Sequence, residues 1–481
     1  MGNAIVWLRD DLRLADNPAL NAAISHAQAT GGRLVILYVL DEVSGGVRPL
    51  GGAVKWWLHH SLERLAARIE RLDGTFILRR GAAFDELRKL LRETDATGVF
   101  WNRRYGGAER DLDAEIKGYA SAAGLEAQSF QANLMFEPWT VRTGGGTPYT
   151  VFTPFWKSCL NRPEPIRSPL DAPTNLLGLD SSSTPARDAL ASDDLDAWSL
   201  LPTNPDWSLG LSLRWQPGEV AAHEKLEHFI EHRLEGYAAG RDFPADNNTS
   251  ELSPHLRFGE ISPFQIFERI RRVPTSGASD DMLEGIRRFK AEVGWREFSY
   301  NLLFHWPDLA TNNFDSRFDH FEWSDPNDGR LAAWKQGTTG VPLVDAGMRE
   351  LWQTGYMHNR VRMVAASFLI KNLLIDWRIG EAWFWDTLVD ADPANNAASW
   401  QWVAGCGADA APYFRVFNPM LQAEKFDSEK RYRERYLGNY ETDIDYPAPI
   451  IDLATSRGEA LEAFANVSGR SKLVRPPQDV T

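Results

Sequence analysis

The first 130 residues alternate between short apolar runs and amphipathic stretches. Four of the runs are rich in β-branched and aliphatic residues, which is typical of buried strands. They are AIVWL, RLVILYVL, TFILRR and GVFWNRR. Between them, apolar residues recur at spacings of three and four, as in residues 54–62, and this period indicates helices. Strands that alternate with helices predict a doubly wound parallel sheet, so we expect a Rossmann-like α/β domain over residues 1–135.

The pattern changes in the middle of the chain. Residues 160–210 hold seven of the 27 prolines and seven serines, and their eight acidic residues outnumber three basic ones. This composition is typical of a surface linker, which we place at residues 136–215. Helical periodicity dominates from about residue 216, so residues 216–470 are expected to form an all-α domain. Residues 471–481 have the composition of a frayed C-terminal tail.

Composition narrows the functional classes. The chain has 481 residues, enough for two or three domains, and no stretch approaches the roughly 18 apolar residues of a membrane span. The N-terminus carries charges where an export signal needs an apolar core, so we expect a cytoplasmic protein without a membrane partner. The net charge of -14 disfavours non-specific nucleic-acid adhesion but leaves a local basic groove open. Cys159 and Cys406 are too few for a disulfide framework or an iron–sulfur cluster.

Two segments of the helical half suit a phosphate-bearing or aromatic ligand. The segment TSELS, residues 249–253, places three hydroxyls at the start of a helical stretch, where they can cap the helix or hold phosphate oxygens. Glu292 and Trp295 are three residues apart and share a helical face, with Arg296 one turn after Glu292. The structural alternative is an ion pair between Glu292 and Arg296 beside a core indole.

Two further segments are rich in polar side chains. Residues 357–377 predict one helix with polar residues crowded at one end, which indicates either phosphate contacts or a solvated helix end. Residues 390–402 gather carboxylates, amides and indoles, which suits a flat heterocycle with donor and acceptor edges. Asp392 lacks companion His or Cys residues at ligand spacing, so we expect no metal. The 19 tryptophans exceed what core packing requires, and core positions, electron transfer and ligand stacking are all open to them.

Nine motifs, taken in order along the sequence, resemble the photolyase and cryptochrome flavoproteins. They are WLRDDLRLADNPAL, PYTVFTPFWK, GYAAGRDFP, TSELSPHLRFGEIS, GWREF, MHNRVRM, LLIDWRIGE, DADPANNAASWQW and DAAPYFRVFNP. The resemblance covers nearly the whole chain. It implies an antenna chromophore in the α/β domain, and FAD in a bent conformation in the helical domain, beneath a groove for DNA.

The resemblance also implies a set of flavin contacts. These are Tyr237, Thr249, Ser250, Leu252, Ser253, Arg296, Asn359, Arg362, Asp390, Asp392 and Asn396. Asn396 stands where the family places a residue beside flavin N5, and an amide there accepts from the protonated, reduced ring. Plant cryptochromes carry Asp at that position, so Asn396 favours repair. Glu251 replaces an Arg that many members carry, which removes one possible DNA or phosphate contact.

The implied reaction is light-driven repair of cyclobutane pyrimidine dimers in DNA, by electron transfer from excited reduced FAD to a flipped-out dimer. The implied pocket has Glu292 at the dimer edge, Trp295 and Trp402 as walls, and Asn359 and Met363 along its floor. Members that repair 6-4 photoproducts carry His where this chain has Asn359, which disfavours that activity. The implied contacts to the DNA backbone are Arg241, Arg360, Arg415 and Lys425.

Three tryptophans occupy the positions of the family's electron-transfer chain from FAD to the surface. They are Trp400, Trp377 and Trp323, and the alternative is three core indoles. The implied rival function is a cryptochrome-type blue-light photoreceptor without repair activity. The complete pocket and a sequence that ends near residue 481, without a long signalling tail, favour repair. A nicotinamide-dependent redox enzyme is disfavoured because the first half has no nucleotide-binding glycine fingerprint. We expect a monomer whose partner is UV-damaged DNA.

The antenna region departs from one branch of the family. Asn102-Arg103-Arg104 replaces the Asn-Glu pair that binds methenyltetrahydrofolate in enterobacterial-type members. The block around Trp57 resembles plant cryptochromes and bacterial class III dimer photolyases. We therefore expect a class III member with a 5,10-methenyltetrahydrofolate antenna near Trp57, Asn102 and Arg103. A core role for Trp57 is the alternative for that residue, and a deazaflavin or no antenna is the alternative for the cofactor.

Overall fold

The computed structural model describes residues 2–163, 166–180, 182–183, 185–410, 414–469 and 477–478. Its N-terminal part contains a five-stranded sheet in the order β3-β2-β1-β4-β5, and each neighbouring pair of strands is parallel. The strands are β1 (Asn3–Leu8), β2 (Leu34–Leu40), β3 (Thr75–Arg80), β4 (Ala96–Asn102) and β5 (Glu126–Phe130). The predicted doubly wound α/β domain is confirmed.

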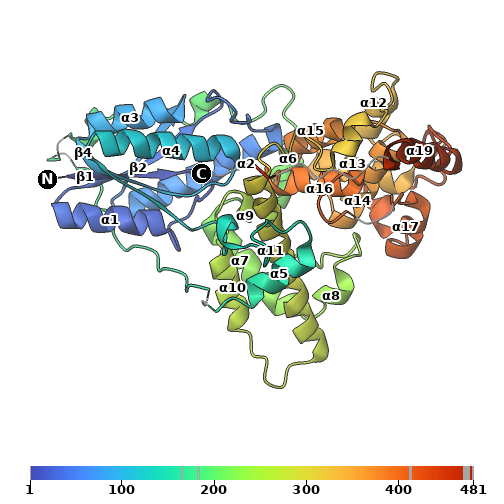
Figure 1. Cartoon of the computed structure of the whole chain (residues 1–481), viewed down its shortest axis with the longest axis horizontal. Helices are drawn as coiled ribbons and strands as arrows, with labels where there is room; N and C mark the ends of the chain where they lie inside the picture. The colour runs from blue at the N-terminus through green and yellow to red at the C-terminus, as the bar shows by residue number, and fades with distance from the viewer. Residues whose placement is uncertain are drawn as a thin grey trace.

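Helices cover both faces of the sheet, with α3 and α4 on one side and α1 on the other (Figure 1). The helices of this part are α1 (Pro18–Thr30), α2 (Gly52–Arg71), α3 (Ala83–Glu93) and α4 (Gly107–Ala122). Successive side chains of a strand point to opposite faces. In β1, Val6 and Leu8 join the core that contains α1 and α2, whereas Ile5 and Trp7 join the core beneath α3 and α4. Because both faces are buried, β1 and β2 are buried along their full lengths.

The segment expected as a linker, residues 136–215, contains several short helices. They are η1 (Pro138–Thr140), α5 (Phe152–Leu160), η2 (Arg187–Ala189), η3 (Asp196–Trp198) and α6 (Leu209–Arg214). Helix α5 packs on α11 (Asp280–His305), and its Phe152 and Phe155 belong to the same apolar core as that helix. Part of this segment is therefore built into the helical domain.

The rest of the protein is helical, which confirms the predicted all-α domain. Besides α11, its helices are α7 (Glu219–His232), α8 (Tyr237–Gly240), α9 (Ser253–Arg257), α10 (Pro263–Arg271), η4 (Ser316–His320), α12 (Arg330–Gln336), α13 (Pro342–Thr354), α14 (Asn359–Ser367), η5 (Phe368–Asn372), α15 (Trp377–Thr387), α16 (Asn395–Ala404), α17 (Pro419–Phe426), α18 (Arg431–Leu437) and α19 (Leu453–Ser468). Every helix within the ranges given above is too short or too polar to cross a membrane. Most of the predicted tail, residues 471–481, lies outside the described residues.

The prediction of one helix over residues 357–377 is wrong. Helix α14 ends at Ser367, a turn of π-helix follows, and α15 begins at Trp377. Leu374 has a φ of 53°, in the left-handed region, which ends the helical path. Asp376 then caps α15, because its side chain accepts from the Arg378 backbone N–H at 3.0 Å. The apolar spacing continues across the break, so periodicity alone could not reveal it.

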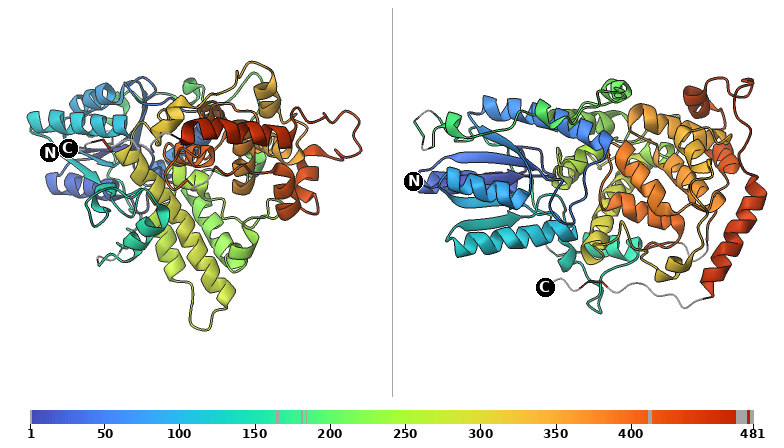
Figure 2. Two further views of the ribbon diagram at one scale, coloured as in Figure 1. Left: turned by 45° about the vertical axis from the view of Figure 1, so that its right-hand side comes forward. Right: turned by 90° about the horizontal axis from the view of Figure 1, so that it is seen from above.

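The sheet domain and the helical domain lie side by side (Figure 2). One contact between them joins the segment after β2 to α15. Trp385 Nε1 donates to the Pro49 carbonyl at 2.9 Å, and the Gly52 backbone N–H donates to Asp386 Oδ1 at 2.8 Å. A second contact is the pair between Arg257 of α9 and Asp10 after β1, at 2.9 Å. These contacts hold the end of the sheet against the helices that surround the cavity described next.

Candidate functional site

One cavity in the helical domain collects most of the predicted site residues. Its volume is about 570 Å³, which lies within the range of ligand and cofactor sites. Its walls come from α8, α9, α11, α14, α15, α16 and the loop before α16. The predicted residues in its lining are Tyr237, Arg241, Ser250, Leu252, Ser253, Glu292, Trp295, Arg296, Asn359, Arg360, Arg362, Met363, Asp390, Asp392, Asn396, Trp400 and Trp402.

Glu292 and Arg296 of α11 both line the cavity, but they have different partners. Glu292 forms an ion pair with Arg241, whose guanidinium lies over the Tyr237 ring at 5.4 Å. Arg296 donates to the Asn133 carbonyl at 2.5 Å. The alternative of a Glu292–Arg296 ion pair is therefore wrong, since tertiary contacts take both side chains away from each other.

A second ion pair stands beside the first. Arg360 Nη2 lies 2.7 Å from Asp242 Oδ2, and the Arg360 guanidinium also lies over the Phe426 ring at 4.4 Å. The side chains of Arg241 and Arg360 are 13% and 20% exposed, so both are partly accessible to solvent. Both arginines donate to carboxylates, and a phosphate group can replace these carboxylates as the acceptor.

Ser250 and Ser253 of the hydroxyl-rich segment line the cavity, and Ser253 bonds to the loop before α16. Its Oγ donates to Asp390 Oδ2 at 2.6 Å, and Arg362 Nη2 donates to the same oxygen at 2.9 Å. The other oxygen, Asp390 Oδ1, is buried and has no hydrogen-bond partner within the described protein. Leu252 occupies the N-cap position of α9, so the cap alternative does not describe the role of the hydroxyls. An unpartnered buried acceptor is costly unless a ligand donor meets it.

Asp392 lines the cavity but uses its carboxylate to fold the loop before α16. Oδ1 accepts from the backbone N–H groups of Ala394 and Asn395 at 2.9 and 2.8 Å, and from Asn395 Nδ2 at 3.0 Å. Oδ2 accepts from the Tyr300 hydroxyl at 2.8 Å. Burial raises the pKa of Tyr300 well above its usual value, so the hydroxyl stays a donor. Asp392 therefore shapes the cavity wall through contacts with other protein groups.

The aromatic walls are held by other parts of the protein. Trp295 stacks on Phe152 of α5, with ring centroids 3.7 Å apart and an angle of 11° between the planes. Trp402 Nε1 donates to the Asp409 carbonyl at 3.0 Å. Both indoles are half-buried, and Asn359 is exposed at the start of α14. These supports leave flat apolar faces available to a ligand that enters the cavity.

Some predicted contacts lie outside the cavity. The Thr249 carbonyl accepts from Arg233 Nη1 at 3.0 Å. Lys425 is exposed on α17, next to Phe426, whose ring lies 6.3 Å from that of Phe243 near α8. Arg415 is exposed, with its guanidinium 5.9 Å from the Phe417 ring centroid. The two predicted DNA contacts that do line the cavity are Arg241 and Arg360.

The three predicted electron-transfer tryptophans lie in α16, at the start of α15 and after η4. Trp400 lines the cavity and packs against α15 so closely that a Cβ on Gly380 would lie 2.2 Å from its ring. Trp377, at the start of α15, is fully buried and donates from Nε1 to Asn313 Oδ1 at 2.9 Å. Trp323 is half-buried, and the next residue, Ser324, donates its backbone N–H to the Leu374 carbonyl. Trp400 and Trp377 are thus both buried, and Trp323 is the most exposed of the three.

The three predicted antenna residues have partners within the protein. Trp57 is fully buried, donates from Nε1 to Glu260 Oε1 at 3.0 Å and stacks on Phe258 at 6.0 Å. Asn102 Nδ2 donates to Asp11 Oδ2 at 2.6 Å, and Arg103 pairs with Glu137 at 2.6 Å. The idea that a pterin stacks on Trp57 is therefore wrong, because protein covers the ring; the core alternative describes this residue.

Glu251 has a structural role beside the cavity. It pairs with Arg214 at 2.9 Å and with Lys225 at 3.3 Å, and its backbone has a left-handed φ of 53°. Burial alone would raise the pKa of Glu251, but the charges of Lys225 and Arg214 outweigh burial and hold it below its usual value. The acidic residue that replaces the family's Arg thus neutralises cations of its own protein.

Sequence reasoning missed several residues of this site. Asp242 and Tyr356 line the cavity, and burial raises the pKa of Tyr356 to about 12. Arg257 also lines it, with Nε donating to the Ala391 carbonyl at 2.7 Å. Asp242 and Arg257 lie within the motifs GYAAGRDFP and TSELSPHLRFGEIS, so those motifs carried a signal for them. Phe152, which supports Trp295, lies in PYTVFTPFWK, within the segment expected as a linker.

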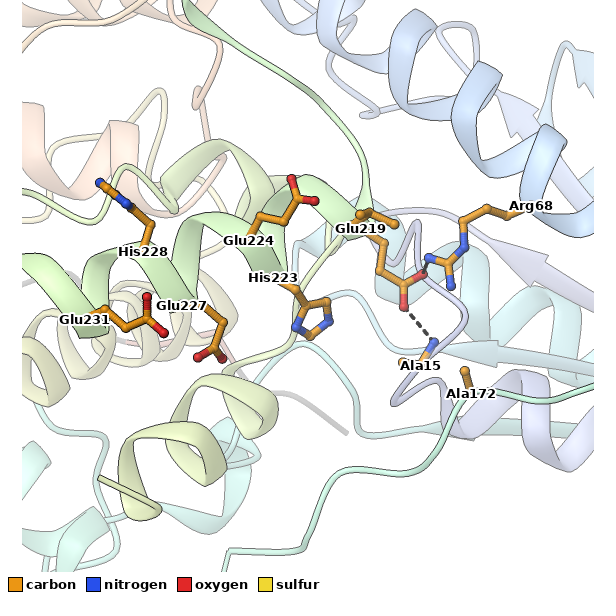
Figure 3. Close-up of a pocket in the computed structure, with 10 residues that line it drawn as sticks. Ala15, Arg68, Ala172, Glu219, His223, Glu224, Glu227, His228 and Glu231 are labelled. Atoms are coloured by element: carbon orange, nitrogen blue, oxygen red, sulfur yellow. Dashed lines mark hydrogen bonds and ion pairs between the residues drawn. The ribbon is translucent and has the colours of Figure 1, made fainter. Parts of the chain in front are cut away.

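A second cavity, of about 610 Å³, lies along α7 and is acidic (Figure 3). Glu219 faces the sheet domain there and accepts from the Ala15 backbone N–H at 3.0 Å and from Arg68 at 2.5 Å. Its other titratable lining residues are His223, Glu224, Glu227, His228 and Glu231. Several carboxylates on one wall repel phosphates, so this cavity does not suit a nucleotide or DNA.

Potential metal ligands gather away from both cavities. His59, His60 and Glu63 on α2 each offer one ligand atom, and these atoms lie within 4.8 Å of one another. His60 and Glu63 are already 3.5 Å apart as a pair. These three residues are not part of the lining of the first cavity.

The first cavity, of about 570 Å³, fits a flavin nucleotide in its chemistry. It combines the unpartnered carboxylate oxygen of Asp390 with the guanidinium of Arg362 and the apolar side chains of Leu252, Phe289 and Leu388. A flavin ring offers N–H and carbonyl groups along one edge and large apolar faces, which match this set. The residues present serve to bind and orient, as expected where a cofactor carries the reaction.

The chain is similar to known photolyases and to a cryptochrome. The FAD binding domain of DNA photolyase matches residues 289–442, and the DNA photolyase family matches residues 4–174. The deoxyribodipyrimidine photo-lyase of Agrobacterium fabrum is 46% identical, over 96% of this chain and 98% of that protein. A bacterial class III photolyase from Agrobacterium tumefaciens has a TM-score of 0.88 at 44% identity, over 98% of each of the two proteins. The Synechocystis cryptochrome has a TM-score of 0.84 at 26% identity, over 96% of this protein and 99% of that one.

Proposed function

Because this chain belongs to the photolyase/cryptochrome family of FAD-binding proteins, we propose that it repairs cyclobutane pyrimidine dimers in DNA with light. The observation that carries the proposal is that Glu292, Trp295, Asn359, Met363 and Trp402 line one cavity together. Reduced FAD, when bound, supplies an electron on absorbing light. The protein supplies binding, orientation and electrostatics.

The flavin is held by the polar groups of α9, α14 and the loop before α16. Ser253 and Arg362 both donate to Asp390 Oδ2 and so fix the carboxylate, which leaves Oδ1 to accept from a ring N–H. Asn396 presents its amide from α16. The proposed set also includes Tyr237, Thr249, Ser250, Leu252, Arg296, Asn359 and Asp392. Thr249 and Asp392 act by shaping the site, because the contacts described above occupy them.

The dimer is held by Glu292 and the two indoles. In the structure Glu292 is paired with Arg241, and a DNA phosphate that competes for Arg241 frees the carboxylate for the dimer edge. Glu292 then hydrogen-bonds the dimer edge and orients it, and it stabilises the negative charge that develops on the dimer when its carboxyl group carries a proton to donate. Trp295 and Trp402 supply faces for stacking, and Asn359 and Met363 supply the floor.

The DNA backbone is held by four cations: Arg241 and Arg360 in the cavity lining, and Arg415 and Lys425 outside it. Arg360 is paired with Asp242 and Lys425 is exposed on α17, so both can turn toward phosphates. Phosphate contacts fix the position of the duplex and leave damage recognition to the cavity. Extrusion of the dimer costs less than extrusion of an intact pair, because a damaged base pairs and stacks poorly.

Trp400, Trp377 and Trp323 form the proposed route by which surface electrons reach an oxidised flavin. The role is supported by Trp400, which lines the cavity, by Trp377, which is fully buried, and by Trp323, which is partly exposed to solvent. We also propose that the protein is a cytoplasmic, monomeric class III enzyme. Its antenna is 5,10-methenyltetrahydrofolate bound in the sheet domain, with Asn102 and Arg103 contacting it only if they leave their present partners. Fluorescence of the pterin released from the purified protein tests the antenna.

The decisive experiment measures repair of an oligonucleotide with one thymine cyclobutane dimer, using reduced holoprotein in blue light and in the dark. We expect repair only in the light. Glu292→Gln should lower its rate about tenfold to a hundredfold, since hydrogen bonds to charged groups contribute about 1.5–3 kcal/mol. Glu224→Gln, in the acidic cavity, is the matched control and should repair normally. A flavin-loaded, photoreducible protein that repairs nothing would instead indicate a cryptochrome photoreceptor.

A further inference from the structure

Asn396 uses its amide nitrogen entirely within the protein. Nδ2 donates to the Glu381 carbonyl at 3.1 Å and to Glu381 Oε1 at 2.8 Å. The reverse orientation of the amide would place Oδ1 beside two acceptor oxygens. These contacts therefore fix Nδ2 as the atom that faces Glu381. Asn396 also lines the cavity, and its carbonyl oxygen is therefore the polar atom that it offers to a ligand.

Glu381 is itself held by a residue of the other domain. Arg48 donates from Nη1 to Oε1 at 2.7 Å and from Nη2 to Oε2 at 2.8 Å, a two-pronged pair in which the Glu381 side chain is only 3% exposed. A buried carboxylate without a cation is strongly disfavoured, so Arg48 makes the charged form of Glu381 tenable. Both oxygens accept from Arg48, and Oε1 also accepts from Asn396.

Arg48 is positioned by the domain interface. It lies in the segment between β2 and α2 of the sheet domain, and its guanidinium stacks over the Trp385 ring at 4.1 Å. The Pro49 carbonyl next to it accepts from Trp385 Nε1 at 2.9 Å. An unbroken series of contacts thus runs from the sheet domain through Glu381 to the wall of the cavity.

We propose that Arg48 is a positioning residue of the flavin site: across the domain interface it holds Glu381, and through it keeps the Asn396 oxygen turned toward the flavin. The inference rests on the proposed flavin site. An oxidised flavin carries a lone pair on N5, whereas the reduced ring carries an N–H there. A wall that offers only an acceptor therefore favours reduced flavin, and docking of the sheet domain contributes to this preference.

The test is the equilibrium between oxidised and reduced flavin in holoprotein, titrated with dithionite against a reference dye. Arg48→Met removes the guanidinium but keeps an apolar side chain of similar length. Glu381 then loses both charged donors and holds Asn396 less firmly, so the amide is free to turn. We expect the ratio of reduced to oxidised flavin to fall at least tenfold at a given potential, which is about 30 mV for a two-electron couple.

The matched control is Asp386→Ala. Asp386 holds the same interface by accepting from the Gly52 backbone N–H at 2.8 Å, but it does not touch Glu381. We expect this variant to titrate like the parent protein. Arg48→Met with Glu381→Gln leaves no buried charge and keeps an acceptor for Asn396, so it should recover most of the ratio. Light-induced infrared difference spectra should show a shifted carbonyl stretching band of the Asn396 amide in Arg48→Met alone.

Two outcomes would overturn the inference. One is an unchanged ratio in Arg48→Met, and the other is an equal loss in Asp386→Ala, which would assign the effect to loosening of the interface. Neither readout involves DNA. A protein that shows the expected flavin shift but repairs no dimer would therefore contradict the proposed function and leave the role of Arg48 standing.

Discussion

Asp392 offers a sharp test of how the cavity is built. Its carboxylate accepts two backbone N–H groups, the Asn395 amide and the Tyr300 hydroxyl, and it is buried. Asp392→Ala removes all four acceptor contacts at once. Asp392→Asn keeps the shape and keeps Oδ1 for the first three donors, while Tyr300 can rotate its hydroxyl to accept from the new NH₂ group.

The magnitude follows from the donors left without a partner. Each buried donor that loses its acceptor costs about 1–3 kcal/mol, and two of the four are backbone N–H groups that cannot turn away. Water that enters the space left by the side chain recovers part of the loss. We therefore expect Asp392→Ala to lower the free energy of unfolding by about 4 kcal/mol, and Asp392→Asn to lower it by about 1 kcal/mol.

The assay is urea unfolding of the holoprotein, followed by far-ultraviolet circular dichroism and by release of flavin. We expect flavin to leave Asp392→Ala at a lower urea concentration than it leaves the parent protein. The reason is that the loop before α16 loses the carboxylate that accepts its hydrogen bonds. Asp392→Ser serves as a control that keeps one oxygen near the donors. A loss below about 1 kcal/mol in Asp392→Ala, or equal losses in Ala and Asn variants, would refute the reasoning.

The remaining predictions concern electron transfer and pH. Trp377→Phe should abolish photoreduction of oxidised flavin but leave repair intact once the flavin is reduced chemically; normal photoreduction in this variant would contradict the electron route. Burial lowers the pKa of His358 from 6.5 to about 4, so this histidine is neutral in the folded protein while the unfolded protein binds a proton. Stability should therefore fall as the pH drops from 6.5 toward 4, by up to about 3 kcal/mol from this group. His358→Gln should flatten that part of the pH profile in thermal unfolding, and an unchanged slope would contradict the assignment.

Local patterns predicted much of the fold for a physical reason. A strand buried on both faces needs an uninterrupted apolar run, and a helix with one buried side needs apolar residues every three or four positions. Both requirements act within ten residues or so, so they are visible in β1, β2 and α2 without any tertiary information. Helix ends follow different rules. The break between α14 and α15 depends on the left-handed Leu374 and the cap at Asp376. The spacing of apolar residues does not reveal either of them.

The candidate site was predictable where its residues are neighbours in a motif. Glu292, Trp295 and Arg296 lie within one helix, and Asp390, Asp392 and Asn396 lie within one loop and the helix that follows. Their partners were not predictable. Glu292 pairs with Arg241 rather than with Arg296, and Arg296 reaches Asn133, 163 residues away in the sequence. Which of two plausible partners a residue takes depends on three-dimensional distances that sequence spacing does not contain.

By itself, the sequence determined the α/β and all-α halves, the family resemblance and many of the residues that line the first cavity, because each depends on residue type and local order. Only the tertiary structure decided how those residues are held. It covers Trp57 with protein, stacks Phe152 of the expected linker on Trp295, and brings Arg48 to Glu381, 333 residues away. Such contacts form where packing of whole domains brings distant segments together, and their energies depend on burial and geometry that exist only in the folded protein.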